Sequence, residues 1–474
     1  MLEKIRQTIE GKKVLILGFG REGRSSLRLV CKAGGWERLA VSDQREVDPS
    51  REAGENEVEL HTGEHYMDRE LLDSFDIVFK TPGIVLPEEP DAYRCRFVSQ
   101  TELFIERFRD QIVGITGTKG KSTTSSLLYH ILKETGEDTV LAGNIGIPVF
   151  DIAEDIMPGE VIVLELSCHQ LEHIRVSPRI AVLLNLYEEH LDHYGTMAKY
   201  VRAKQNIYAW QREGDILFCS VDVLPGKEIE GAGKESARVP CRGEVISAVM
   251  VPEGEKARGA GDIEVAGNAV RYRGSGLRIP EEGISLFGRH NYFDIGVVYG
   301  ICKEFSVTDE KFLKALRTFQ TLPHRLQYLG VKEGIRFYDD SISTIGETTI
   351  QALESVKNVD SILIGGMDRG VDYSQLEEYL AGSSVRHIIL MEATGKRIYR
   401  EIQENYPTLF ASGRLELTGH LGEAVDLARR LGEEGGACVL SPAAASYGIF
   451  KNFEERGEYF RQYVFGEEGR QTAS

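Results

Sequence analysis

The sequence predicts an α/β protein of three domains, and three observations support this prediction. The chain has 474 residues, too many for one ordinary hydrophobic core. Short apolar strands alternate with helical patterns in three successive series, as parallel sheets require. Glycine-rich turns follow the first strand in two of these series. We expect domains over residues 1–110, 111–321 and 322–474. The outer two are expected to be Rossmann-like, and the central one to have a mostly parallel sheet plus small antiparallel strands.

The composition is typical of a soluble globular protein, with 42% hydrophobic and 27% charged residues. No apolar run reaches the roughly 20 residues needed to cross a bilayer, and the N-terminus has no signal-peptide core, so we expect a cytoplasmic protein. The formal net charge of −18 is unfavourable for general nucleic-acid binding. The seven cysteines show no zinc spacing, which predicts reduced thiols. An anionic ligand must therefore be held by local groups such as helix N-termini, metal ions and single basic residues.

The first series opens with an apolar strand at 14–17 that runs into the turn GFGREG at 18–23. Glycines at such a turn allow close approach of a ligand to a helix N-terminus, and Asp43 ends the next strand, where it could meet a ribose. The loop at 81–84 follows another strand and is expected at the same edge of the sheet. The motif is equally typical of a turn that merely packs a helix on a strand.

The second series contains the strongest local signal, the loop GTKGKS at 117–122 between a strand at 112–116 and a helix that ends near Gly136. Its glycines let backbone N–H groups converge on phosphate oxygens, Lys121 adds a positive charge, and the Ser122 hydroxyl can ligate magnesium. The spacing departs from the strict phosphate-loop pattern because Ile115 stands where the first glycine belongs. We predict a triphosphate-binding loop, with a glycine turn that binds no nucleotide as the alternative.

Acidic residues follow two further strands of this series. Glu165 ends the apolar strand at 161–166, and EEHLDH at 188–193 follows the strand at 180–186. Hard oxygen ligands and an imidazole would collect at the carboxyl edge of the sheet, where a second magnesium ion could bind beside the phosphate loop. The alternative is a solvated acidic turn.

Other candidates are less distinctive in the sequence. Lys204 lies in a helical pattern at 197–210, where a lone lysine is usually a surface residue. The pair His290-Asn291 could open a helix and contact a nucleotide, or form a buried hydrogen-bonded pair. Residues 223–282 are rich in glycine and charge and predict small antiparallel strands. In the third series, the small residues at 441–446 follow a strand and precede an aromatic helix at 450–460, which leaves room for a ligand.

Eight segments together resemble the Mur ligases, in the family's order and over nearly the whole chain. They are GTKGKS at 117, GNIG at 143, LELSCHQLE at 164, EEHLDHY at 188, GRHN at 288, LPHR at 322, DDSIST at 339 and SPAAASYGIFKNFEERG at 441. The resemblance implies a UDP-sugar domain, a central P-loop ATPase and an amino-acid domain. It also implies a peptidoglycan-precursor reaction in which ATP phosphorylates the carboxylate of UDP-MurNAc-L-Ala and the amine of glutamate attacks the acyl phosphate. A monomer is expected.

The resemblance also implies a role for individual residues. Lys121, His190 and Lys204 would be catalytic, and Ser122, Glu165, His190 and Lys204 would hold two magnesium ions, with Lys204 carbamylated on its amine. ATP would contact Gly117, Thr118, Lys119, Gly120, Lys121, Ser122, Thr123, Asn291, Arg325 and Asp340. The UDP-sugar would contact Gly18, Asp43, Gln44, Arg45, Gly83, Asn144 and Gln170. Glutamate would contact Thr344, Arg369, Ser446 and Phe453.

Three positions depart from the family pattern. Asp294 replaces an asparagine expected near the adenine. Ile342 stands in the place of a lysine, and Arg369 stands in the place of another. The last two changes touch the amino-acid pocket and should move the preferred carboxylate position. D-glutamate is the family default and our expectation. L-glutamate is the alternative, because DSIST with DRG is similar to a subgroup that adds L-glutamate.

Three rival functions share parts of this pattern. A folylpolyglutamate-synthase-like ligase would share the ATP site but not a uridine-binding first domain, so the GFGREG unit and Asp43 disfavour it. A nucleotide-dependent switch would hydrolyse ATP without any amino acid. An NAD-dependent dehydrogenase would use the GxGxxG turn, but the rest of the chain supplies no hydride-transfer site.

Overall fold

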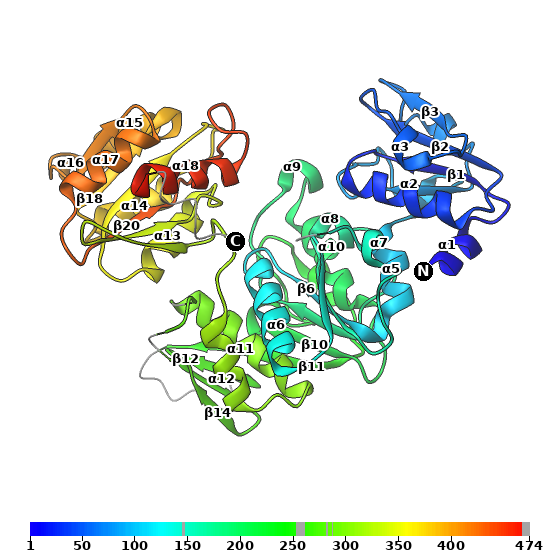
Figure 1. Ribbon diagram of the computed structural model, residues 1–474, viewed down its shortest axis with the longest axis horizontal. Helices are drawn as coiled ribbons and strands as arrows, with labels where there is room; N and C mark the ends of the chain where they lie inside the picture. The colour runs from blue at the N-terminus through cyan, green and yellow to red at the C-terminus, as the bar shows by residue number, and fades with distance from the viewer. Residues whose placement is uncertain (145–146, 253–260, 281–282, 287, 467–474) are drawn as a thin grey trace. The chain divides into compact units, whose positions relative to one another are not determined.

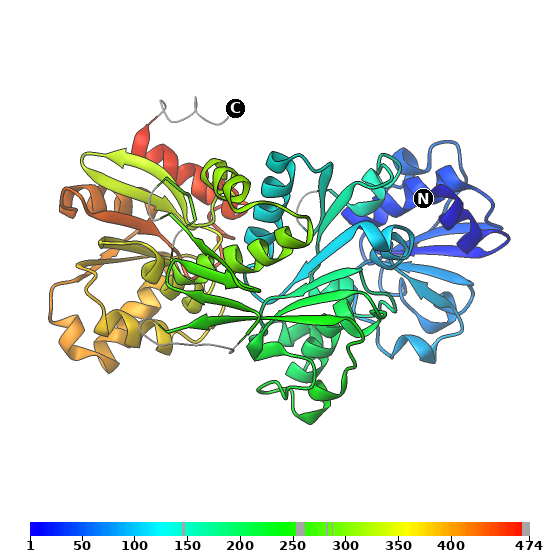
Figure 2. The ribbon, with the colours of Figure 1, turned by 90° about the horizontal axis from the view of Figure 1, so that it is seen from below.

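The computed structural model describes residues 1–144, 147–252, 261–280, 283–286 and 288–466. Their strands form three sheets, which Figure 1 colours from blue to red along the chain and Figure 2 shows turned by 90°. The chain divides into two compact units. The described residues within 1–279 and 293–316 form the first and contain two sheets, while those within 280–292 and from Arg317 onward form the second. The three-sheet α/β architecture is confirmed, and the domain boundaries at 110 and 321 remain predictions.

The first sheet is parallel throughout, with the order β3-β2-β1-β4-β5. Its central strand, β1, is buried from Val14 onward, as its unbroken apolar run requires. The strands are β1 (Lys13–Leu17), β2 (Arg38–Asp43), β3 (Glu59–Thr62), β4 (Ile77–Lys80) and β5 (Arg96–Val98), and the α-helices are α1 (Leu2–Ile9), α2 (Arg21–Ala33), α3 (Ser50–Ala53), α4 (Arg69–Leu72) and α5 (Gln100–Phe108).

The second sheet has the order β14-β13-β12-β11-β10-β9-β6-β8-β7. Its strands are β6 (Ile112–Thr116), β7 (Thr139–Gly143), β8 (Val161–Glu165), β9 (Ile180–Leu183), β10 (Ile216–Ser220), β11 (Glu244–Val251), β12 (Ile263–Ala266), β13 (Ala269–Tyr272) and β14 (Ser275–Arg278). Its α-helices are α6 (Lys121–Thr135), α7 (Val149–Ile152), α8 (Cys168–Leu171), α9 (Leu191–Tyr194), α10 (Met197–Ala209), α11 (Arg289–Glu304) and α12 (Asp309–Thr318).

The glycine-rich segment at 223–282 is only partly as predicted. β12, β13 and β14 are antiparallel neighbours, as expected. β11 instead pairs in parallel with both β10 and β12, so the expectation that it is antiparallel was wrong. Strand alternation reports which face is buried and not the direction of the pairing partner, so the sequence gives no signal for this difference.

The third sheet has the order β15-β16-β20-β17-β18-β19, with only the β15–β16 pair antiparallel. Its strands are β15 (Gln327–Lys332), β16 (Ile335–Asp339), β17 (Val359–Gly365), β18 (His387–Met391), β19 (Leu415–Thr418) and β20 (Ala437–Leu440). Its α-helices are α13 (Gly346–Ser355), α14 (Ser374–Gly382), α15 (Glu392–Asn405), α16 (Pro407–Phe410), α17 (Leu421–Leu431) and α18 (Phe453–Phe465). Within the described ranges, no helix combines the length and apolarity needed to span a bilayer.

The sheets place the candidate residues at strand ends. β6 leads into the 117–120 loop, β8 ends at Glu165, and β9 precedes the acidic turn at 188–190. These three strands are neighbours in one parallel group, so their carboxyl ends share one edge of the sheet. Ligands bind at this edge in doubly wound folds.

Candidate active site

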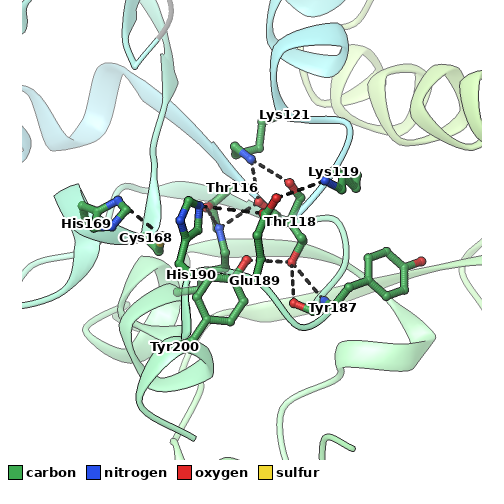
Figure 3. Close-up of polar contacts among 12 residues, drawn as sticks. Thr116, Thr118, Lys119, Lys121, Cys168, His169, Tyr187, Glu189, His190 and Tyr200 are labelled. Atoms are coloured by element: carbon green, nitrogen blue, oxygen red, sulfur yellow. Dashed lines mark hydrogen bonds and ion pairs between the residues drawn. The ribbon is translucent and has the colours of Figure 1, made fainter. Parts of the chain in front are cut away.

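The loop after β6 is stabilised by two lysines that meet at one carbonyl oxygen. Lys121 Nζ donates to the carbonyl oxygens of Gly117 and Thr118, both at 2.9 Å. Lys204 Nζ, from α10, donates to the same Gly117 oxygen at 2.8 Å. Figure 3 shows Lys121 beside this loop, with Glu189 and His190 on the facing segment. The two ammonium groups therefore converge where a polyphosphate would be bound.

Lys204 is almost completely buried, with 1% of its surface exposed, so the surface-residue alternative is excluded. Its Nζ lies 5.1 Å from the ring centre of Tyr200, one helical turn earlier in α10. Burial, followed by the nearby charge of Lys121, lowers the pKa of Lys204 to about 7. A lysine in this environment is partly neutral at physiological pH and can act as a nucleophile.

Glu165 has one carboxylate oxygen paired and one not. Its Oε1 accepts a hydrogen bond from Asn144 Nδ2 at 2.8 Å. Its Oε2 is fully buried and has no hydrogen-bond partner among the described residues. A buried carboxylate oxygen without a donor is costly unless a cation satisfies it, so this arrangement fits a divalent metal ion. Ser122, also buried, lies in the first turn of α6.

The acidic turn after β9 is not simply solvated. Glu189 Oε1 forms an ion pair with Lys119 Nζ at 3.0 Å. Burial disfavours the Glu189 carboxylate, but Lys119, His190 and Lys121 together hold the pKa of Glu189 below its usual value. His190 caps α9 with a φ of 57°, an uncommon left-handed conformation outside glycine, and its Nε2 lies 3.8 Å from Glu189 Oε2. Such strain is frequent at functional sites.

A pocket of about 430 Å³ contains many of these groups. Six predicted residues line it: Lys121, His190, Lys204, Gly83, Asn144 and Gln170. Other residues line it that the sequence did not single out, among them Arg21, Glu22, Ser167, Cys168 and His169. The first of these lie inside the GFGREG turn and the others border Gln170, so adjacency to predicted residues was the available signal. The pocket thus brings together residues that come after strands of the first sheet and residues that come after strands of the second sheet.

The GFGREG turn is explained partly by packing. A side chain at Gly23 would lie 1.9 Å from the Gly18 carbonyl oxygen, and one at Gly18 would lie 2.2 Å from Thr81 Oγ1. Asp43 accepts backbone hydrogen bonds from Phe19 at 2.7 Å and Arg45 at 2.9 Å, which fixes the turn. A side chain at Gly20, the N-cap residue of α2, would have no other group within 4 Å, which leaves space for a ligand. The side chains of Gln44 and Arg45 are exposed.

In the second unit, Asp340 is the centre of a buried network that joins three loops. Its Oδ2 accepts hydrogen bonds from Ser343 at 2.6 Å and Ser441 at 2.7 Å, and its Oδ1 accepts one from the Leu326 backbone at 3.1 Å. Burial raises the pKa of Asp340 to about 7, against the effect of these hydrogen bonds. Asn291 and Arg325, the other predicted ATP contacts in this unit, are half-buried.

The predicted glutamate contacts follow strands of the third sheet. Ser446 is buried and Thr344 half-buried, while Arg369 is exposed. The ring of Phe453 lies 6.1 Å from that of His324. Arg456 was missed by the sequence reading. Its side chain is fully buried and its Nη2 donates to the carbonyl oxygens of Ser341 at 2.7 Å and Ala444 at 2.9 Å. Arg456 thereby ties together the two loops that carry the predicted contacts.

A phosphate loop at the carboxyl edge of a parallel sheet, with the half-buried Lys121 and the buried Lys204 at one carbonyl oxygen, defines the class of P-loop nucleotide-binding enzymes. The family model "Mur ligase middle domain" matches residues 115–291, which include this loop. The MurF ligase from Thermotoga maritima, solved in complex with ADP, shares the fold, with a TM-score of 0.55 at 16% identity. The match covers 97% of this chain and 95% of that one.

Two of its sequence relatives match almost the full chain, and both are named UDP-N-acetylmuramoylalanine–D-glutamate ligase. The protein from Geobacillus kaustophilus is 34% identical over 95% of this chain and 96% of its own length. The protein from Ligilactobacillus salivarius is 32% identical over 98% of this chain and 97% of its own length. The chain belongs to the Mur ligase family.

Proposed function

We propose that this Mur ligase joins D-glutamate to UDP-N-acetylmuramoyl-L-alanine with ATP as the energy source. The observation that carries this proposal is the pocket of about 430 Å³, which Lys121 and Lys204 line together with Gly83 from the loop after β4. Cations that suit a phosphoryl group therefore share one pocket with the loop expected to contact a UDP-sugar. This combination is expected of an enzyme that phosphorylates its UDP-linked substrate.

The proposed reaction has two steps. The γ-phosphoryl group of ATP passes to the alanyl carboxylate, which gives ADP and an acyl phosphate. The glutamate amine then attacks the carbonyl carbon, and the tetrahedral intermediate expels phosphate as the ammonium loses a proton. Lys121 stabilises the negative charge on the transferring phosphoryl group, since its Nζ already lies over the 117–118 carbonyls.

Magnesium, when bound, supplies the positive charge that phosphoryl transfer requires. Ser122, Glu165, His190 and Lys204 would hold it. Among the described residues, no three His, Cys, Asp or Glu side chains form a metal cluster, and only two of these four residues are of those types. The unpaired Glu165 Oε2 is the structural support for the assignment.

We also propose that Lys204 carries a carbamate. The neutral amine attacks carbon dioxide, forms the N–C bond and releases a proton, which converts the side chain from a cation to an anion. The lowered pKa of Lys204 supports this step because only the neutral amine is nucleophilic. The resulting carboxylate is a suitable magnesium ligand, as the lysine ammonium is not.

The enantiomer of glutamate follows from the relatives. Both are named as D-glutamate ligases, at 34% and 32% identity over almost the full chain. L-glutamate is the second candidate, because Ile342 removes a positive charge from the predicted pocket and Arg369 replaces a lysine ammonium by a planar guanidinium. The test supplies the purified protein with ATP, magnesium and UDP-N-acetylmuramoyl-L-alanine, and with each enantiomer separately, and identifies the product by mass. We expect product with D-glutamate, and product with L-glutamate alone would refute the assignment.

The expected cytoplasmic location and monomeric state belong to the same proposal. The cysteines are free thiols, which is typical of a reducing compartment. Sedimentation equilibrium with and without nucleotide tests the monomer, and a concentration-dependent dimer mass would refute it.

A further inference from the structure

Glu172 lies directly after α8, at a meeting point of three nitrogen groups. Its Oε2 is 3.8 Å from Lys80 Nζ, 3.4 Å from His193 Nε2 and 3.5 Å from His173 Nε2. The side chains of Lys80, His193 and Glu172 are 7%, 10% and 18% exposed, respectively. Water therefore screens these interactions much less than it screens a surface ion pair.

The partners of Glu172 belong to separate segments with separate tasks. Lys80 is the last residue of β4, immediately before the loop Thr81–Gly83 that reaches the pocket. His193 lies in α9, whose N-cap is His190. The ring of His169 links these histidines, at 4.4 Å from the ring of His193 and 5.0 Å from that of His190. A single carboxylate therefore joins the loop of the first sheet to the segment of the proposed phosphoryl-transfer site.

The backbone around Glu172 is itself held in place. Asn206 Nδ2, from α10, donates to the carbonyl oxygens of Leu171 at 2.9 Å and Glu172 at 3.0 Å. Gln170 Nε2 donates to Glu22 Oε1 at 2.9 Å. Because α10 also carries Lys204, these bonds hold the Glu172 backbone at a fixed position relative to that lysine.

We infer that Glu172 is a positioning residue that holds the Thr81–Gly83 loop and the His190 segment in register for the UDP-linked substrate. This inference rests on the proposed function for the identity of that substrate. Removal of the carboxylate would leave Lys80 buried with Glu22 as its remaining nearby acid, so β4 would lose its tie to α9. The loss should appear in handling of the UDP-linked substrate and not in binding of ATP.

The test compares Glu172→Gln with Glu154→Gln. Glu154 forms an ion pair with Lys32 at 2.5 Å that also joins a helix of the first sheet to a segment of the second, but its side chain is 36% exposed, against 18% for Glu172. For Glu172→Gln we expect the KM for UDP-N-acetylmuramoyl-L-alanine to rise about tenfold, with the KM for ATP within about twofold of wild type. Glu154→Gln should match wild type in both constants.

A double-mutant cycle with Lys80→Met separates positioning from general damage. Because both changes break the same link, the double variant should show a smaller rise in KM than the product of the two single effects. Multiplicative effects would overturn the inference, as would equal rises in both KM values or a wild-type KM in Glu172→Gln. If Glu172→Gln fails to fold, Lys80→Met alone must still raise the KM selectively, and otherwise the inference fails.

A binding experiment distinguishes failure of the proposed function from failure of the inference about Glu172. Calorimetric binding of UDP-N-acetylmuramoyl-L-alanine to the wild type and to both glutamate variants needs no turnover. Binding without ligation would refute the proposed reaction, while weakened binding in Glu172→Gln alone would still support the inference. Equal binding in all three proteins would refute the role of Glu172.

Discussion

At the scale of single residues, burial determines what Lys204 can do. Its ammonium group has lost most of its water, faces the second cation of Lys121, and donates to a backbone oxygen that both lysines share. These conditions favour the neutral amine. A lysine exposed to solvent would instead be a cation at every physiological pH.

Replacing Lys204 by arginine tests this chemistry. We expect Lys204→Arg to lower kcat by about 100-fold or more, because a guanidinium stays charged and cannot form a carbamate. Protein prepared in 13C-labelled bicarbonate should give a carbamate signal by NMR in the wild type and none in the variant. Lys199→Arg, an exposed change on the same helix, is the matched control and should retain wild-type activity. Activity of Lys204→Arg near that of the control would contradict the carbamate proposal.

Asp294 provides a prediction on pH. Burial raises the pKa of Asp294 to about 8, against a hydrogen-bonding effect of Thr124. Between about pH 4 and pH 8 the folded protein therefore keeps a proton that the unfolded chain releases. More protons bound in the folded state means that the free energy of unfolding falls as pH rises through this window. Asparagine does not ionise, so Asp294→Asn should lose this part of the slope.

Thermal unfolding at pH 5 and pH 8 measures the effect of Asp294. The difference in Tm, variant minus wild type, should become more positive at the higher pH. The comparison of the two proteins at each pH removes the contribution of other groups that titrate, such as Asp340. A difference in Tm that does not change with pH would show that Asp294 is not a buried neutral acid.

At the scale of elements, helix α6 and its loop were largely predictable. The GTKGKS motif predicted the order strand, loop and helix. The expected end of the helix near Gly136 agrees with its observed last residue, Thr135. The start of α18 was placed three residues early, because the apolar pattern begins at Phe450 whereas the Asn452 side chain caps the helix by accepting from Glu455 N at 2.9 Å. The edge strands β15 and β19 were not predicted, because neither has the buried apolar run that marks β20.

The candidate site was less predictable than the fold. The edge residues Glu165 and His190 followed from strand ends, but the burial of Lys204 depends on which face of α10 packs on the sheet. Arg456 and Glu172 are invisible in the sequence because their role lies in contacts with backbone and with distant segments. Single charged residues in helical patterns are usually exposed to solvent. Only the neighbours of Arg456 and Glu172 in three dimensions distinguish these two residues from ordinary surface residues.

The two glycines that flank α6 test how the phosphate loop is built. Gly120 and Gly136 cap the two ends of the helix with φ values of 83° and 104°. A side chain at Gly120 would lie 2.9 Å from Asp294 Oδ1, whereas one at Gly136 would meet nothing within 4 Å. Both alanine variants should lose about 1–2 kcal/mol of stability from backbone strain.

Only Gly120→Ala should also raise the KM for ATP, because its methyl group would displace Asp294 from beneath the loop. Chemical denaturation and steady-state kinetics on both variants measure the two effects. An equal KM for ATP in Gly120→Ala and Gly136→Ala would show that the contact with Asp294 does not shape the nucleotide site.

At the scale of the whole molecule, the residues assigned to the three substrates are distributed over two compact units. The UDP-sugar contacts and most of the phosphate-binding residues lie in the first unit, and the glutamate contacts lie in the second. A ligase whose substrate contacts are distributed in this way should complete both catalytic steps only when all three substrates are present. A nucleotide switch, the rival of a different class, would need only the first unit's phosphate loop.

The measurement that tests the ligase assignment most directly is phosphate release from ATP in an omission series. The purified protein receives ATP and magnesium, and then UDP-N-acetylmuramoyl-L-alanine, D-glutamate, or both. We expect sustained release only with both substrates, with one phosphate for each amide formed. Sustained release with ATP alone, or release that neither D-glutamate nor L-glutamate changes, would contradict the assignment of this chain as a ligase.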